Sequence, residues 1–273
     1  MTDQPVRPKD LKGAEVWLAA HGLTDVRPTP LLATRLAARQ RARLTAAVLL
    51  AAFIVAVALV YTVDRSTGAG DDGSGPYRHW SLLVLTAVVV GLVLAQSLLD
   101  RRVRRADRRA GATLQRRAAH SVRPGWRTVL GWPRAAFSVA TFAGGMVLAI
   151  SALTTQDSTA RYAALVLLIG LCGAAVGTVV QLRHVLTHPV VADDEASLTT
   201  DFLMRVEDAR EVTTPTLVWC LPTASVLAAV PGSWITAWIV FVALSAVTLA
   251  LITVGTGLAA RRRGRATTAP VNR

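Results

Sequence analysis

Residues 100–134 read DRRVRRADRRAGATLQRRAAHSVRPGWRTVLGWPR and separate two long apolar runs. This stretch holds eleven arginines against two aspartates, Asp100 and Asp107, so its net charge is +9. Such a segment crosses a lipid bilayer only at a high cost in free energy, and short loops rich in Lys and Arg stay in the cytoplasm. The stretch therefore fixes the side of a membrane on which the neighbouring apolar segments begin and end.

The composition of the 273-residue chain also favours a membrane protein. Hydrophobic residues make up 52% of it and its mean hydropathy is +0.43. A soluble domain of this length is less apolar and scatters its charges along the chain. Here charged and apolar residues alternate in blocks, and six apolar runs reach the roughly 17–25 residues that a membrane span needs. We predict an all-α polytopic membrane protein with six transmembrane helices.

The predicted bundle covers residues 44–258, with its charged segments at the ends of the spans. A cytoplasmic segment, residues 1–43, precedes it, and a basic cytoplasmic tail, residues 259–273, follows it. We expect a short amphipathic helix over residues 10–21, stopped by Gly22, that lies on the membrane surface; a disordered tail is the alternative. A basic helix over residues 31–43 leads into the first span. The spans are predicted at residues 44–63, 80–99, 135–153, 162–181, 214–230 and 234–258.

The distribution of basic residues predicts the topology. The four segments assigned to the cytoplasm hold 8, 11, 3 and 5 Lys and Arg residues, whereas the three outer loops together hold only Arg65, Arg78 and Arg161. This asymmetry is the one expected for an even number of spans with both termini inside. We therefore expect a multi-pass protein of the cell membrane with both termini in the cytoplasm.

Few polar side chains are available for chemistry within the predicted spans. They contain no Asp, Glu, Lys, Arg or His, whereas ion-coupled transporters keep an ionisable group at membrane depth. No P-loop, H-E-x-x-H or G-x-S-x-G motif occurs, so neither an enzyme nor a cofactor is predicted. His184 and His188 have the i, i+4 spacing of two metal ligands, but no third His or Cys ligand is near, and we predict no metal site.

The basic stretch and the acidic loop after the fourth span are the candidate contact regions. We expect the arginines of the first to attract anionic lipids of the cytoplasmic leaflet or a protein partner, and nucleic acid is not favoured. The second, residues 182–213, has seven acidic residues against three arginines. The candidate lipid or partner contacts are Arg101, Arg102, Arg104, Arg105, Arg108 and Arg109.

An amphipathic helix is predicted within the acidic loop, at residues 194–212. Leu198, Phe202, Leu203 and Val206 lie on one helical stripe. Asp201 and Arg205 form an i, i+4 pair that contributes about 0.3 kcal/mol when exposed. We hypothesise that this helix docks beside the basic helix of residues 100–120, with opposite charges and the apolar stripe supplying the affinity.

Gly173 and Gly177 are one helical turn apart in the fourth predicted span. Small residues at this spacing allow another helix to approach closely. Tight packing within the chain is the default expectation, and self-association of two copies is the alternative.

Two resemblances to known families follow from these features. Six spans with inside termini and short outer loops resemble the permease subunits of type-2 ABC exporters, which implies cytoplasmic helices that couple to a separate ATPase. The segment from Asp193-Asp194-Glu195 through Glu207-Asp208-Ala209-Arg210 resembles uncharacterised integral membrane proteins of high-GC bacteria. Neither resemblance carries a functional residue over to this chain.

Two functional hypotheses follow. The first is a non-enzymatic membrane scaffold or accessory component that binds a soluble partner through its cytoplasmic helices. The second is the membrane subunit of an ABC-type transporter, energised by a separate ATPase. The short outer loops leave no room for a substrate-capturing domain, which favours the first hypothesis.

Overall fold

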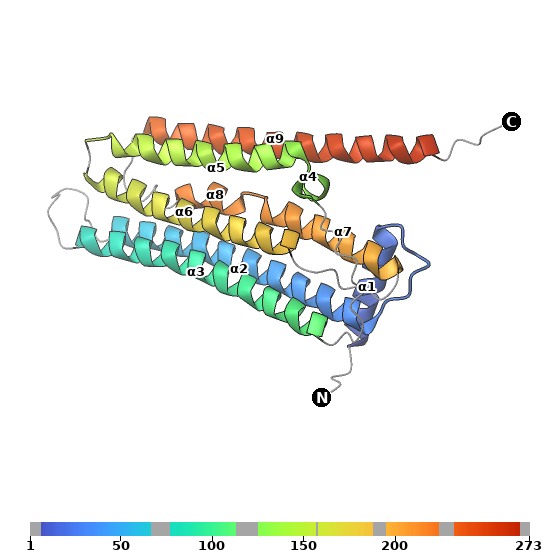
Figure 1. The fold of residues 1–273 in the computed structure, drawn as a ribbon. Helices are drawn as coiled ribbons and strands as arrows, with labels where there is room; N and C mark the ends of the chain where they lie inside the picture. The colour runs from blue at the N-terminus through green and yellow to red at the C-terminus, as the bar shows by residue number, and fades with distance from the viewer. Residues whose placement is uncertain are drawn as a thin grey trace. The chain divides into compact units, whose positions relative to one another are not determined.

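The computed structural model describes residues 7–66, 77–112, 125–156, 158–187, 195–223 and 232–267. The secondary structure assigned within these ranges is helical and includes no strand, as the sequence predicts (Figure 1). The helices are α1 (Pro8–Ala20), α2 (Pro30–Ser66), α3 (Tyr77–Ala112), α4 (Trp126–Val129), α5 (Trp132–Leu153), α6 (Ser158–Thr187), α7 (Glu195–Val212), α8 (Thr216–Cys220) and α9 (Gly232–Thr267).

Five helices are long and apolar enough to cross a membrane. Each contains or nearly matches one of the predicted spans. The sixth prediction, residues 214–230, is described only as α8 and three further residues, because residues 224–231 lie outside the described ranges. The structure therefore establishes five candidate spans and leaves the sixth a prediction. The five are Pro30–Val63, Leu83–Arg105, Trp132–Leu153, Ala160–Thr187 and Ser233–Leu258.

The chain divides into two compact units. Unit 1 comprises residues 1–123 and 179–208, and unit 2 comprises residues 124–178 and 209–273. The boundaries between the units cut α6 after residue 178 and α7 after residue 208.

Unit 1 is built on the paired helices α2 and α3 (Figure 1). The basic helix expected before the first span and the span itself form one continuous helix, α2, which confirms that expectation. Residues 30–43 extend α2 by about 20 Å beyond the apolar run at 1.5 Å per residue. The second predicted span likewise continues past Asp100 to Ala112. Unit 1 therefore has helical extensions at the charged ends of both spans.

A tight turn places α1 against the start of α2. Gly22 adopts a φ of +75°, a conformation that side chains with a Cβ rarely take, directly after the end of α1. Its neighbour Leu23 donates its amide to the carbonyl of Leu18 at 2.9 Å, which satisfies a carbonyl of the last turn. The sequence-predicted helix over residues 10–21 and its stop at Gly22 are thus confirmed.

In unit 2, α5 and α9 pack closely at a pair of glycines. A Cβ added to Gly144 would lie 2.7 Å from Cε2 of Phe241 in α9. At Gly145, an added Cβ would lie 3.2 Å from Cγ1 of Val218 and 3.6 Å from Cη2 of Trp238. Helices approach each other this closely only where one lacks a side chain. In the described part of unit 2, the glycines that allow this close contact therefore lie on α5.

The expected packing glycines of α6 behave differently. A Cβ added at Gly177 meets no atom within 4 Å in the described structure. Gly173 is half-buried. The described structure therefore shows no close helix contact at Gly177. Self-association of two copies through this face stays a prediction.

Aromatic side chains hold the other end of the α5–α9 contact. The indole of Trp234 donates to the carbonyl oxygen of Leu148 at 3.1 Å. Its ring meets that of Trp238 edge to face with centroids 5.6 Å apart, and Trp238 meets Phe241 in the same way at 5.4 Å. Such arrangements add about 0.5–1.5 kcal/mol per pair beyond burial. Trp234 and Trp238 thus join the two helices.

The remaining faces of the spans carry large exposed apolar side chains. Val48 of α2, Val139 of α5 and Leu251 of α9 are 67%, 70% and 68% exposed. An apolar surface of this extent is unfavourable in water and favourable in lipid. The faces are therefore those expected of helices surrounded by lipid.

A matched pair of alanine substitutions tests the α5–α9 contact. Gly144→Ala should lower the melting temperature of the detergent-solubilised protein, because the added methyl group displaces Phe241 from its contact with Trp238. Gly177→Ala should leave it unchanged or raise it, because alanine is favoured over glycine within a helix by about 1 kcal/mol. Equal losses for both variants would show that Gly144 is not a special contact.

Candidate functional site

A polar site in the described part of unit 1 joins α7 to the N-terminal extension of α2. Arg35, Arg39 and Arg43 recur at intervals of four along α2, so they share one face of that helix. Arg35 Nη2 lies 2.8 Å from Asp201 Oδ1 of α7. Arg39 Nε lies 3.0 and 2.8 Å from the two carboxylate oxygens of Asp208. We call this set, with Arg205 and Glu207, the α2–α7 ion cluster.

Asp201 is the centre of the ion cluster. It accepts from Arg35 on one oxygen and from Nε of Arg205 at 2.8 Å on the other. Its side chain is only 2% exposed, and those of Arg35 and Arg205 are 8% and 9% exposed. The pair that the sequence predicted as a weak surface interaction is therefore buried. Removing one partner of a buried pair leaves a desolvated charge and typically costs 3–5 kcal/mol.

Glu207 connects the same face of α7 to both α1 and α2. One of its oxygens accepts a hydrogen bond from the indole of Trp17 at 3.0 Å, across 190 residues of sequence. The other lies 3.4 Å from Nη1 of Arg43. Trp17 also stacks on His21, with ring centroids 4.1 Å apart. The three helices therefore meet around one network of charged and aromatic groups.

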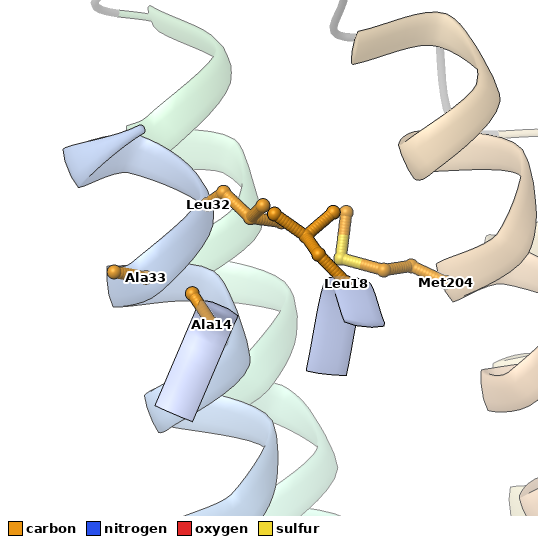
Figure 2. Packing of buried hydrophobic residues seen from close by; sticks show 5 residues of the cluster. All are labelled: Ala14, Leu18, Leu32, Ala33 and Met204. Atoms are coloured by element: carbon orange, nitrogen blue, oxygen red, sulfur yellow. The ribbon is translucent and has the colours of Figure 1, made fainter. Parts of the chain in front are cut away.

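An apolar cluster lies beside the ion cluster. Ala14 and Leu18 of α1, Leu32 and Ala33 of α2 and Met204 of α7 are each at most 6% exposed. Figure 2 shows Leu18 and Leu32 directed toward the Met204 side chain. Burying a leucine or methionine side chain stabilises a fold by about 1.5–3 kcal/mol, and burying an alanine methyl group by less. The ion pairs specify which faces meet, and this cluster supplies apolar burial at the same junction.

One face of α1 packs against other helices, and its location on the membrane surface stays a prediction. Its fully buried residues, Ala14 and Leu18, contact α2 and α7 rather than lying exposed for lipid. Protein therefore covers Ala14 and Leu18, whereas the apolar side chain of Val16 is 63% exposed. The indole N–H of Trp17 needs an acceptor, and the Glu207 carboxylate supplies one at 3.0 Å, which an apolar membrane interior would not.

The orientation of α7 is the reverse of the one its apolar stripe suggests. The buried positions include Thr200, Asp201, Met204 and Arg205. Leu198 and Phe202 are 42% and 36% exposed. The remaining members of the predicted stripe, Leu203 and Val206, are half-buried. A charged face of α7 is thus turned inward, and much of its apolar stripe is accessible.

The ion pairs described between α7 and another helix are made with α2. The hypothesis that α7 docks beside residues 100–120 stays a prediction, because the side chains of residues 106–120 lie outside the description. Arg101, Arg102 and Arg105 are exposed and Arg104 is half-buried. Residues 113–124 and the side chains of Arg108 and Arg109 lie outside the description. These arginines remain candidate contacts for lipid or protein.

Sequence reasoning identified α7 as a helix but did not predict its ion pairs with α2. The signal was present in the i, i+4, i+8 spacing of Arg35, Arg39 and Arg43, which matches carboxylates on a second helix. It was outweighed by the larger charge of residues 100–134. The net charge of a loop indicates only how strongly the loop as a whole attracts an acidic helix. The spacing of charged residues along a helix determines which face can form ion pairs.

Substitution of Asp201 tests the buried part of the ion cluster. Asp201→Asn should lower the free energy of unfolding of unit 1 by about 3–5 kcal/mol, because Arg35 and Arg205 lose their shared carboxylate. Thermal melting in detergent, with limited proteolysis after α7, measures the effect.

Asp10→Asn is the matched control for that substitution. Asp10 pairs with Arg41 at 3.4 Å, and the Arg41 side chain is 63% exposed, so the loss should stay below about 1 kcal/mol. A loss at Asp201 no larger than that at Asp10 would contradict a structural role for the buried pair.

The interactions described at this site are ion pairs, hydrogen bonds and apolar contacts between helices. Among the described residues no group of three or more His, Cys, Asp or Glu side chains is arranged to hold a metal ion; His188 lies outside them. Comparison of the chain with protein-family models, with curated proteins and with solved structures gives no match.

Proposed function

We propose that this protein is a non-enzymatic membrane scaffold that presents α7 to a soluble protein in the cytoplasm. The observation that carries the proposal is the reversed orientation of α7. Leu198 and Phe202 are accessible while the charged face of the same helix is held by α2. Exposed apolar side chains on a segment outside the predicted spans favour a protein partner.

The anchoring of α7 supports a binding role. A helix fixed by buried ion pairs and by Trp17 loses little conformational freedom when a partner binds it. Binding by a pre-ordered surface avoids much of the entropy cost that a disordered loop would incur. The short exposed stripe suits a partner that contributes its own apolar groove, in the manner of helix-in-groove recognition.

The proposed orientation has six spans, both termini in the cytoplasm and the protein in the cell membrane. Support comes from the distribution of Lys and Arg, 27 in the assigned inner segments against 3 in the outer loops. Unit 1's ion cluster then lies on the cytoplasmic side, where anionic lipid and soluble partners are both present.

Cysteine accessibility in intact cells tests this topology. In a chain with Cys172→Ala and Cys220→Ala, a membrane-impermeant maleimide should label Gln156→Cys, between α5 and α6, from outside. It should label Thr24→Cys and Asn272→Cys only after permeabilisation. Labelling of Asn272→Cys in intact cells would mean an odd number of spans.

A pull-down from mild detergent, followed by mass spectrometry, tests partner binding. The wild-type chain should retain a soluble protein at stoichiometric level, and Leu198→Glu/Phe202→Glu should lose it at least tenfold, since each buried apolar contact contributes about 1.5–3 kcal/mol. Val16→Glu, at an exposed apolar position of α1, is the control. Recovery of the chain alone, or equal recovery by the double variant, would contradict the proposal.

The second candidate is the membrane subunit of a transporter energised by a separate ATPase. Only three residues, Thr213 to Pro215, separate α7 from α8. A partner that moved α7 would thus act close to the membrane part of the chain. Recovery of an ATPase in the same pull-down would favour this candidate, and α7 would be its coupling helix.

A further inference from the structure

A pair of tryptophans in unit 2 is exposed at the start of a candidate span. Trp126 of α4 and Trp132 of α5 lie with ring centroids 6.0 Å apart and are 38% and 67% exposed. Neither indole N–H has an acceptor in the described part of the chain. An exposed indole with an unused N–H suits a boundary at which one edge of the ring is apolar and the other is wet.

A turn at Gly131 brings the two rings together. Gly131 adopts a φ of +76°, which favours glycine, and donates its amide to the carbonyl of Arg127 at 3.1 Å. Val129 and Leu130, just before the turn, are 3% and 8% exposed. The turn therefore buries its aliphatic side chains and leaves its aromatic ones accessible. We call residues 125–133 the tryptophan corner.

Arg127 adds a positive charge to the exposed side of the tryptophan corner. Its guanidinium carbon lies 5.3 Å from the centre of the Trp126 ring, which is a cation–π contact. The side chain is exposed and forms no ion pair with a described residue. An arginine can stack on an aromatic ring and still donate to phosphate oxygens through the edge of its guanidinium. The exposed side thus combines apolar rings, N–H donors and one cation.

The position of the tryptophan corner on α5 determines which part of a bilayer it meets. Trp132 is the first residue of the candidate span Trp132–Leu153, so it lies at the edge of the hydrocarbon if α5 crosses the membrane. The Trp126 ring is 6.0 Å from the Trp132 ring, and the headgroup layer of one leaflet is about 5–7 Å thick. Both rings therefore lie within about one headgroup thickness of that edge, whatever the tilt of α5. A protein partner would have to displace lipid headgroups to reach them.

We propose that the tryptophan corner is seated in the phospholipid headgroup layer, where its two indole N–H groups and Arg127 bind headgroup oxygens. Every phospholipid carries phosphate oxygens, so the corner binds the headgroup layer in general rather than one anionic lipid. Its burial there fixes the depth at which α5 enters the membrane. The proposal depends on α5 being a span but not on the proposed soluble partner of α7.

Fluorescence quenching of the full chain in phosphatidylcholine nanodiscs tests the position of the two rings. Subtracting the emission of W126F/W132F from that of wild type isolates them, and phenylalanine keeps an aromatic ring at each position. The isolated emission should be quenched most by phosphatidylcholine with a nitroxide on its headgroup. Strongest quenching by iodide would place the rings in water, and strongest quenching by a nitroxide near the end of the acyl chain would place them in hydrocarbon. Either result would overturn the proposal.

A spin label measures the same depth without changing either tryptophan. In a chain with Cys172→Ala and Cys220→Ala, the label is attached at Thr128→Cys, an exposed position of α4. Its collisions with oxygen and with a water-soluble nickel complex should place it in the headgroup layer. Thr24→Cys, exposed in the turn after α1, is the control and should be fully accessible to nickel. Equal nickel accessibility at the two positions would overturn the proposal.

Charge reversal tests the role of Arg127. In the chain labelled at Thr128→Cys, R127E should raise nickel accessibility about twofold, because a carboxylate is repelled by headgroup phosphates that attract a guanidinium. R101E reverses an exposed arginine of α3 and should leave the label where it is. Unchanged accessibility in R127E, or an equal rise in R101E, would overturn the binding of headgroup oxygens by Arg127.

Discussion

The burial of Asp201 between two arginines is the constraint on which the junction of α1, α2 and α7 depends. A carboxylate removed from water is tolerated only when its charge is matched and its oxygens accept hydrogen bonds. Arg35 and Arg205 meet that requirement at 2.8 Å each. Because Arg35 lies on α2 and Arg205 on α7, satisfying one buried charge also fixes which faces of the two helices meet.

Several other features follow from this pairing. Once the Asp201 face turns inward, Asp208 and Glu207 fall within reach of Arg39 and Arg43, and Met204 enters the apolar cluster with Leu18. The remaining circumference of α7, including Leu198 and Phe202, must then face away from α2. The exposed stripe is therefore a consequence of the ion cluster, and the proposed binding of a partner depends on that consequence. A buried ion pair contributes little net stability, so selection of one arrangement is the more plausible role for it.

Much of the fold could be predicted from the sequence because apolar length and arginine placement are direct physical signals. Five predicted spans correspond to candidate spans in the structure, and the helix that ends at Gly22 is where its stop signal placed it. The pairing of α7 with α2 could not be predicted, since residues 35 and 201 are far apart in sequence and the chain has several basic segments that could pair with one acidic helix. Gly177 was favoured over Gly144 because a G-x-x-x-G spacing is visible in sequence, whereas a close approach to Phe241 is visible only in three dimensions.

Proximity of α1 and α7 is the most direct measure of this arrangement, because Leu18 and Met204 are in contact only when α7 lies against both α1 and α2. In a chain with Cys172→Ala and Cys220→Ala, the pair Leu18→Cys/Met204→Cys should be joined by a short bifunctional maleimide in native membranes. The exposed pair Val16→Cys/Phe202→Cys should react far less. Efficient cross-linking of the first pair alone is the predicted result. Absence of that cross-link, or stronger cross-linking of the exposed pair, would contradict the inward-facing charged surface of α7 and everything derived from it.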